Sequence, residues 1–331
     1  MSTAILQFSI QYSLYSSYIA IISGVIGNTL NILTFTQLKL FQNNRSAFYL
    51  TVESISNLLN QLLSIAINIL INLYGDDATE KSLIWCRSRY AAAQLLLLFT
   101  SYTLCLAAGD QFFSTNYQFN LRNICTIRLA QCLTGIFACI WLIHSIVFTT
   151  SFNIQPSLGC TISDPIWLRY STYFFYPVLI GLLPICIAAL FNILAYRNVR
   201  RIVRRQLPIA RRRLDQQMTA FVLIRVAMLV VLFSPYAIFR TYVLNTPTTQ
   251  DQSLQYAVTR LIQAIVISFY WLNISLSCFV FMILSPRYRR QVAFTLKKKC
   301  WRRLKSTCLM KTNQITAENS NPSNISNIEP E

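Results

Sequence analysis

The fold of this chain is decided by stretches such as residues 170–196, which read YSTYFFYPVLIGLLPICIAALFNILAY and contain no Asp, Glu, Lys or Arg. A helix needs about 20 predominantly apolar residues to cross the hydrocarbon layer of a membrane. A membrane-spanning strand would be shorter and would alternate between apolar and polar residues. The stretch therefore predicts a transmembrane helix.

The same pattern recurs along the chain, which is 54% hydrophobic and only 12% charged, whereas soluble domains are roughly 25% charged. The sixth run reaches spanning length only if it starts near Met218 and includes Arg225. One such run would fit a buried helix of a soluble domain, but seven in series do not. We therefore predict an all-α membrane protein with a seven-transmembrane helix bundle. The other runs are Tyr18–Leu38, Ser54–Gly75, Tyr90–Gly109, Leu129–Ser163, Val226–Phe239 and Leu261–Pro286.

The basic residues predict the orientation of these spans. Of the 29 Lys and Arg residues, 22 fall in the first, third, fifth and seventh segments that follow the N-terminal one. Cytoplasmic loops carry such an excess, so we expect an extracellular N-terminus, a cytoplasmic C-terminus and a multi-pass protein of the plasma membrane. The net charge of +18 then reflects topology and attraction to membrane lipids, and not binding of nucleic acid.

The orientation divides the chain into four regions. We expect a short extracellular N-terminus at 1–17 and the membrane domain at 18–286. A short, basic amphipathic helix is expected at 287–305, after the seventh span. Residues 306–331 are rich in Asn and Ser and end acidic, which predicts a disordered cytoplasmic tail.

The cysteines follow the same map. Cys86 and Cys160 fall on the predicted outer side, where an oxidising compartment favours a disulfide over two free thiols. Cys300 and Cys308 lie among basic residues on the inner side, where they are equally compatible with S-palmitoylation and with plain cytosolic thiols. With one histidine and no Cys/His spacing typical of metal ligands, we expect neither a metal nor a cofactor.

Several landmarks recur in a set order. They are Gly27-Asn28 in the first run, Cys86 and Cys160, Asp110 placed 24 residues after Cys86, Trp141, Pro184, Pro235 and the segment Ser285–Arg290. By these landmarks the chain resembles a rhodopsin-like (class A) G-protein-coupled receptor over about residues 15–300. The resemblance implies the same disulfide, an extracellular ligand, a heterotrimeric G protein as partner, and outward movement of the sixth helix hinged at Pro235.

The departures from the family pattern concern the residues that switch such receptors. The family's Asp-Arg-Tyr motif reads Asp110-Gln111-Phe112, and its Cys-Trp-x-Pro motif reads Leu232-Phe233-Ser234-Pro235. Its Asn-Pro-x-x-Tyr motif corresponds to the segment from Ser277 to Phe281. The family's second-span Asp is replaced by Asn57, and its fifth-span Tyr is replaced by Asn192. The acid at the foot of the sixth span is retained as Asp215. Because Gln111 lacks the charge of the family's arginine, we expect a weaker inactive-state lock and atypical coupling.

Two charged residues fall within predicted spans. Glu53 lies four residues before Asn57, and Arg225 lies ten residues before Pro235. Lone charges in a membrane are costly and usually pair or mark function, so we predict that Glu53 and Arg225 pair and replace the missing lock. The alternative is that Arg225 reaches the membrane surface while Glu53 is protonated.

The residues at the predicted ligand site exclude two ligand classes. The family position that binds an amine is Ala93, and the position that carries retinal is Trp271. Because the segment before the first run, residues 1–17, is too short for a large ligand-binding domain, we expect a short peptide or a small molecule. Three arginines near the mouth are suited either to an acidic ligand group or to pairing with Asp76, Asp77, Glu80 or Asp251. The candidate pocket residues are Arg89, Gln94, Tyr236, Arg240, Arg260, Gln263, Tyr270 and Trp271.

Three functions are compatible with these features. The first is a receptor that signals through a heterotrimeric G protein. The second is a receptor-fold protein without ordinary coupling, such as a scavenger or scaffold, which Gln111 favours. The third is a transporter or channel, but the chain shows no internal repeat of the kind that transporters contain. No set of nucleophile, base and acid points to an enzyme.

Overall fold

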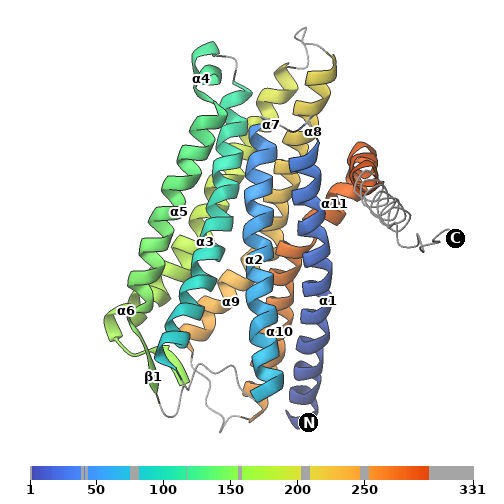
Figure 1. Cartoon of the computed structure of the whole chain (residues 1–331). Coiled ribbons are helices and arrows are strands. Elements are labelled where there is room, and N and C mark those ends of the chain that lie inside the picture. Colours follow the sequence, from blue (N-terminus) through green and yellow to red (C-terminus); the bar gives the residue numbers. More distant parts are fainter. Residues whose placement is uncertain are drawn as a thin grey trace, which may run out of the picture.

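The computed structural model describes residues 2–38, 41, 44–74, 82–116, 118–155, 159–202, 209–246 and 253–297. In these ranges the chain forms a bundle of long helices and one two-stranded sheet (Figure 1). The first half contains α1 (Ser2–Gln37), α2 (Arg45–Tyr74), α3 (Leu83–Ser114), α4 (Phe119–Ile124), α5 (Ile127–Thr149), β1 (Phe152–Gln155) and β2 (Gly159–Ile162).

The second half contains longer rods that change helical type along their length. The first rod consists of α6 (Pro165–Tyr170), the π-helix η1 (Ser171–Leu182) and α7 (Leu183–Ile202). The second consists of α8 (Ile209–Met228), the π-helix η2 (Leu229–Phe233) and α9 (Ser234–Asn245). The bundle closes with α10 (Ser253–Ser275) and α11 (Ser277–Leu284), after which residues 286–297 form a further helix.

The distribution of side chains is that of a membrane protein. Large apolar side chains cover the outside, as in α1, where Ile19, Ile22 and Ile26 are each more than half exposed. Polar side chains such as Asn28 and Gln61 are fully buried. A soluble protein rarely exposes continuous apolar surface of this extent, so the chain is a predominantly helical, multi-pass membrane protein.

Six helical rods of the described chain are long and apolar enough to cross a membrane. They are Ser2–Gln37, Leu83–Ser114, Ile127–Thr149, Pro165–Val199, Gln217–Val243 and Leu254–Ser275. The helix α2 is not among these six, although it packs between α1 and α3. Its buried Asn60 and Gln61 make hydrogen bonds with Tyr270 and Ser275 of α10 inside the bundle.

Three of the helices begin at residues that cap them. The side chains of Ser82, Thr126 and Asp164 accept hydrogen bonds from the backbone N–H groups of Trp85, Leu129 and Ile166. Such caps satisfy N–H groups that the first helical turn leaves without a partner. After Asp164, Pro165 occupies the first helical position, where its lack of an N–H has no cost.

The π-helix η1 makes a backbone carbonyl available for a contact between α3 and the first rod. In a π-helix each N–H bonds to the carbonyl five residues before it, as Leu183 does to Val178. The residue five positions after Leu179 is Pro184, which has no N–H to offer. The hydroxyl of Tyr102 in α3 donates to the Leu179 carbonyl instead, at 3.0 Å. A hydroxyl therefore ties α3 to the first rod at this point.

The π-helix η2 has the same relation to a proline. Pro235 lies five residues after Val230, and the Val230 carbonyl accepts a hydrogen bond from the hydroxyl of Ser234. Because this substitute bond comes from the same rod, η2 is not tied to a neighbouring helix through Val230. The sequence indicates the two prolines but not the change of helical type before each of them.

The two ends of the bundle differ in character, as Figure 1 shows. The N-terminus and β1 lie at one end, which we call the hairpin end. The helix α4 lies at the opposite end, where α7 finishes and α8 starts. We call this the basic end, because Arg45, Arg128 and Arg197 lie at the helix termini there.

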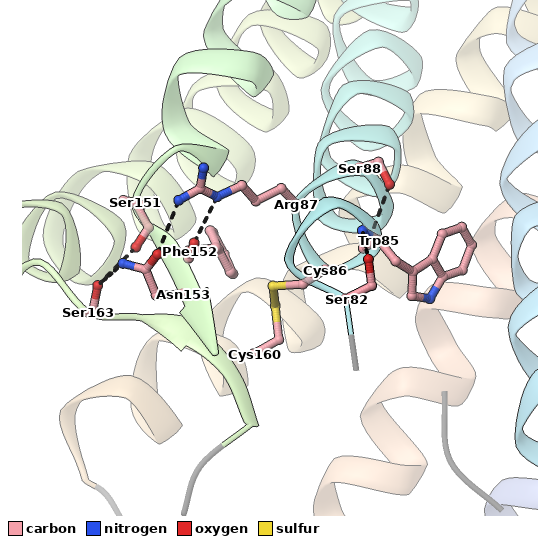
Figure 2. Close-up of a disulfide and its surroundings, with 10 residues drawn as sticks. All are labelled: Ser82, Trp85, Cys86, Arg87, Ser88, Ser151, Phe152, Asn153, Cys160 and Ser163. Atoms are coloured by element: carbon pink, nitrogen blue, oxygen red, sulfur yellow. Dashed lines mark hydrogen bonds between the residues drawn. A yellow bond between two sulfur atoms is a disulfide. The ribbon is translucent and has the colours of Figure 1, made fainter. Parts of the chain in front are cut away.

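A disulfide holds the hairpin against α3 (Figure 2). It joins Cys86 in α3 to Cys160 in β2, with the two Cα atoms 6.0 Å apart, and confirms the predicted pair. Arg87 adds a second link, since its Nε donates to the Phe152 carbonyl at 3.0 Å and its Nη2 to Asn153 Oδ1 at 3.1 Å. At the start of β2, Gly159 has φ 67°, a backbone conformation that glycine adopts without strain.

Three expectations about element boundaries can be compared with the structure. Residues 2–17 are the first turns of α1, whose 36 residues extend for about 54 Å, and the extracellular placement of residues 1–17 stays a prediction. The apolar run Leu129–Ser163 is not one helix, because β1 and β2 occupy its last third. The helix expected at 287–305 is described over 286–297, and the predicted tail, with Cys300 and Cys308, lies outside the described residues.

Candidate functional site

A buried ion pair connects α2 to α8. The guanidinium Nε of Arg225 contacts Glu53 Oε1, and the Arg225 side chain is fully buried. Its Nη1 donates to Asn273 Oδ1 of α10 at 2.6 Å. The predicted pair is therefore present, and the alternative in which Arg225 reaches the membrane surface is wrong. Three helices meet at this arginine.

Gln111 makes a second connection to α8, nearer the basic end. Its amide Nε2 donates to the hydroxyl of Ser46 in α2, and its Oε1 accepts from the hydroxyl of Thr219 in α8 at 2.9 Å. Gln111 is 6% exposed. Gln111 thus joins α3 to α8 through a neutral amide.

The neighbouring Asp110 takes a different partner. Its carboxylate lies 3.4 Å from the Nε of Arg45 in α2, whose Nη1 also donates to the Cys125 carbonyl. Burial raises the pKa of the Cys125 thiol to about 11, and the nearby Asp110 carboxylate adds to the effect. Asp215 belongs to α8, but its side chain lies outside the described residues.

Hydrogen bonds between amides and hydroxyls join α1 to α2 and α10. Asn28 Nδ2 donates to the Ile274 carbonyl at 3.0 Å, and Gln61 Nε2 donates to Ser275 Oγ at 3.1 Å. Gln61 fits only because Gly24 has no side chain, since a Cβ there would lie 1.7 Å from Gln61 Nε2. These bonds hold α1, α2 and α10 as one unit.

The remaining predicted switch residues are buried or half-buried inside the bundle. Phe281 stacks on Phe221 of α8 with ring centroids 4.3 Å apart. Ser277 accepts a hydrogen bond from Asn31 at 3.1 Å. The other three positions are Phe112, which packs on Phe191, Phe233, which is 1% exposed, and Asn57, whose buried amide has no hydrogen-bond partner within the described chain.

A second cluster of polar side chains lies toward the hairpin end. Tyr236 of α9 stacks on Tyr270 of α10 with centroids 5.1 Å apart. The guanidinium of Arg240 lies 5.2 Å from the ring centroid of Tyr176 in η1, and Tyr90 of α3 packs against the same hydrophobic core as Tyr176, Tyr236 and Tyr270. Side chains from four elements thus gather at this core, and we call these five residues the arginine–tyrosine cluster.

The other predicted pocket residues are placed differently. Gln94 lies one turn from Tyr90 on the same face of α3, 6% exposed, and both of its amide atoms lack a partner among the described residues. The ring centroids of Trp271 and Tyr270 lie 5.3 Å apart. Arg260 is exposed and donates to Tyr256 of its own helix, so it does not join the cluster. Arg89 and Gln263 are half-buried.

Several residues of both sites were not predicted. Ser46 and Thr219 carry no sequence signal, because short hydroxyl side chains are common in membrane helices. Asn273 stands out only as part of an Asn-Ile-Ser glycosylation pattern, which does not point to a partner for Arg225. The four acids proposed as partners for the outer arginines, Asp76, Asp77, Glu80 and Asp251, lie outside the described residues.

A scan against models of protein families finds no match to this chain, and a search of curated proteins finds none either. Function therefore has to be inferred from the geometry of the chain itself.

Proposed function

We propose that this chain is a divergent rhodopsin-like receptor of the plasma membrane, with an extracellular N-terminus. In this proposal α2 also crosses the membrane and brings the number of spans to seven. The hairpin end is extracellular, and the basic end faces the cytoplasm. A short peptide or small molecule binds from the hairpin end. A heterotrimeric G protein is engaged at the basic end when α8 moves outward.

The observation that carries the proposal is how α8 is held. On the basic side of η2 and Pro235, Arg225 of α8 pairs with Glu53 of α2, and Thr219 of α8 bonds to Gln111 of α3. Among the described residues, no other residue of α8 contacts α2 or α3 through a charged group or a hydroxyl. On the other side of Pro235, α9 contributes Tyr236 and Arg240 to the arginine–tyrosine cluster. One rod thus reaches both ends, with a proline and a π-helix between them, and such local weakening of a helix is a recognised hinge.

The orientation rests on the basic residues. An excess of Lys and Arg marks cytoplasmic segments, and the disulfide at the hairpin end fits an oxidising compartment. The polar side chains of α2 face inward, α2 packs against α1 and α3, and Asn60 and Gln61 bond to α10. This burial is compatible with a helix that crosses the membrane inside a bundle.

Biosensors for each G-protein family test this proposal in cells that express the full chain at matched surface levels. Thr219→Val removes the hydroxyl that holds Gln111 but keeps the shape of the side chain. A net hydrogen bond contributes about 0.5–1.5 kcal/mol, so the basal signal should rise about two- to tenfold. Thr134→Val is the matched control, because the Thr134 hydroxyl bonds only to the Ala130 carbonyl of its own helix.

The second candidate function is a receptor-fold protein without ordinary coupling. It is favoured by Gln111, which is buried between Ser46 and Thr219 and lacks the charge that the family presents to its G protein. Silence of the wild type, Thr219→Val and Gln111→Arg on every biosensor would support this candidate and contradict the first. A basal signal that Gln111→Arg increases would favour the receptor.

A further inference from the structure

The arginine–tyrosine cluster contains a cation without an anionic partner. Arg240 is half-buried, and among the described residues it makes no ion pair. The guanidinium lies over the ring of Tyr176, Tyr236 lies one turn away on the same helix, and the buried Nε of Arg240 has no hydrogen-bond partner within the described chain. A charged side chain inside a membrane protein is costly unless it is paired, and one that is kept usually marks a function.

A second unpaired polar group, Gln94, lies one helical turn from Tyr90 of the cluster. Both of its amide atoms are buried without a partner in the described chain. A buried donor or acceptor that lacks a partner destabilises the fold, and native proteins keep few of them. Arg240 and Gln94 together therefore offer N–H donors to an acceptor that the described chain does not supply.

The other residues of the cluster indicate which chemical group the rest of the bound molecule carries. Tyr236 and Tyr270 stack with an interplanar angle of 28°, which gives a broad aromatic wall next to the guanidinium. On the extracellular side, the disulfide and Arg87 hold the hairpin over α3. A flat, apolar group of modest size fits such a wall through ring stacking.

We infer that the cluster, together with Gln94, binds a small monocarboxylate that carries an aromatic or similarly flat apolar group. The guanidinium fork matches the two oxygens of a carboxylate, and the Gln94 amide and the tyrosine hydroxyls supply further donors. One cation neutralises one negative charge, which favours a carboxylate over a phosphate dianion. An amine is disfavoured, because the cluster contains no acid and the family's amine-binding position is Ala93.

This inference rests on the proposed function for its biological meaning, but its test is binding alone. Purified full-length chain in lipid nanodiscs is heated with benzoate, phenylacetate, 3-phenylpropionate or indole-3-acetate, each compared with its primary amide at the same concentration. A ligand present at about ten times its Kd should raise the Tm by roughly 2–5 °C. At least one acid should produce this shift, and its neutral amide should not.

Variants assign the shift to the cluster. Arg240→Gln should abolish it, Arg240→Lys should reduce it because a point charge replaces the fork, and Gln94→Leu should weaken it. Arg260→Gln is the matched control, since Arg260 is exposed and bonds to Tyr256, and it should leave the shift unchanged. Arg240→Lys also serves if Arg240→Gln does not fold.

Three results would overturn the inference: no acid in the panel raises the Tm, acid and amide act equally, or the shift survives in both Arg240 variants. The same experiment separates this inference from the proposed function. An Arg240-dependent shift without any biosensor signal would keep the carboxylate site and reject ordinary coupling. Signalling without a shift would do the opposite.

Discussion

Replacing one partner of the Glu53–Arg225 pair should destabilise the protein far more than replacing both. The Arg225 side chain is completely buried, and that of Glu53 is only 3% exposed. Removing one partner of such a pair leaves an uncompensated buried charge, which costs about 3–5 kcal/mol. Glu53→Gln or Arg225→Met alone should therefore lower the Tm by roughly 10 °C.

The double variant and the charge swap isolate the interaction. Glu53→Gln combined with Arg225→Met removes both charges and should recover most of the lost stability, since replacing a whole buried pair is often nearly neutral. Glu53→Arg combined with Arg225→Glu should also recover expression, because the Asn273 amide has a donor as well as an acceptor for the carboxylate placed at position 225.

The assay is a double-mutant cycle on Tm and surface expression, run beside the same cycle on Arg45 and Asp110. The Arg45 side chain is 23% exposed, and such partly exposed pairs contribute about 0–1 kcal/mol. We expect strong coupling for the first pair and weak coupling for the second. If the effects of Glu53→Gln and Arg225→Met simply add, the reasoning about the buried pair is refuted.

Three further predictions concern how the bundle is held together. Gly24→Ala should lower the Tm because its Cβ would displace Gln61, whereas Gly135→Ala, which meets nothing within 4 Å, should be neutral or slightly stabilising; equal effects would contradict the close approach. Tyr102→Phe should cost about 1–3 kcal/mol in thermal unfolding, because it leaves the Leu179 carbonyl without a donor, and Tyr173→Phe, at a ring that is 70% exposed, is the control that should show no change. Cys160→Ser should cost about 4 kcal/mol for a disulfide that closes 74 residues and reduce surface expression, unlike Cys139→Ser at an exposed free thiol; normal expression of both would contradict the role of the disulfide.

Much of the fold could be predicted because membrane helices are encoded by composition. Runs such as 170–196 have no charge, and a backbone in lipid must satisfy its own hydrogen bonds, so a helix follows directly. The hairpin was missed for the same reason. Residues 152–162 are as free of charge as the helix before them, and nothing in hydropathy separates a strand pair at the membrane surface from the end of a span.

The candidate site was predictable only where a residue stood out by its charge. Glu53 and Arg225 are rare in such a setting, so their pairing followed from cost alone. Asn273, Thr219 and Ser46 look like ordinary polar residues of membrane helices, and only the packing of α2, α3, α8 and α10 reveals that they meet Arg225 and Gln111. The sequence also suggested that Gln111 weakens the lock, but not that its amide joins two neighbours.

The most direct test of the account is the distance between α4 and α8 at the basic end. Nitroxide labels introduced by Ile124→Cys and Ala220→Cys, both exposed positions, report it by pulsed electron resonance in nanodiscs, with the exposed native thiols Cys132, Cys139 and Cys186 replaced by serine. We predict one distance for the otherwise unchanged chain, and an additional, longer one when Glu53→Gln, Arg225→Met and Thr219→Val are combined. The same single distance in both proteins would contradict the claim that these buried contacts hold α8 in place.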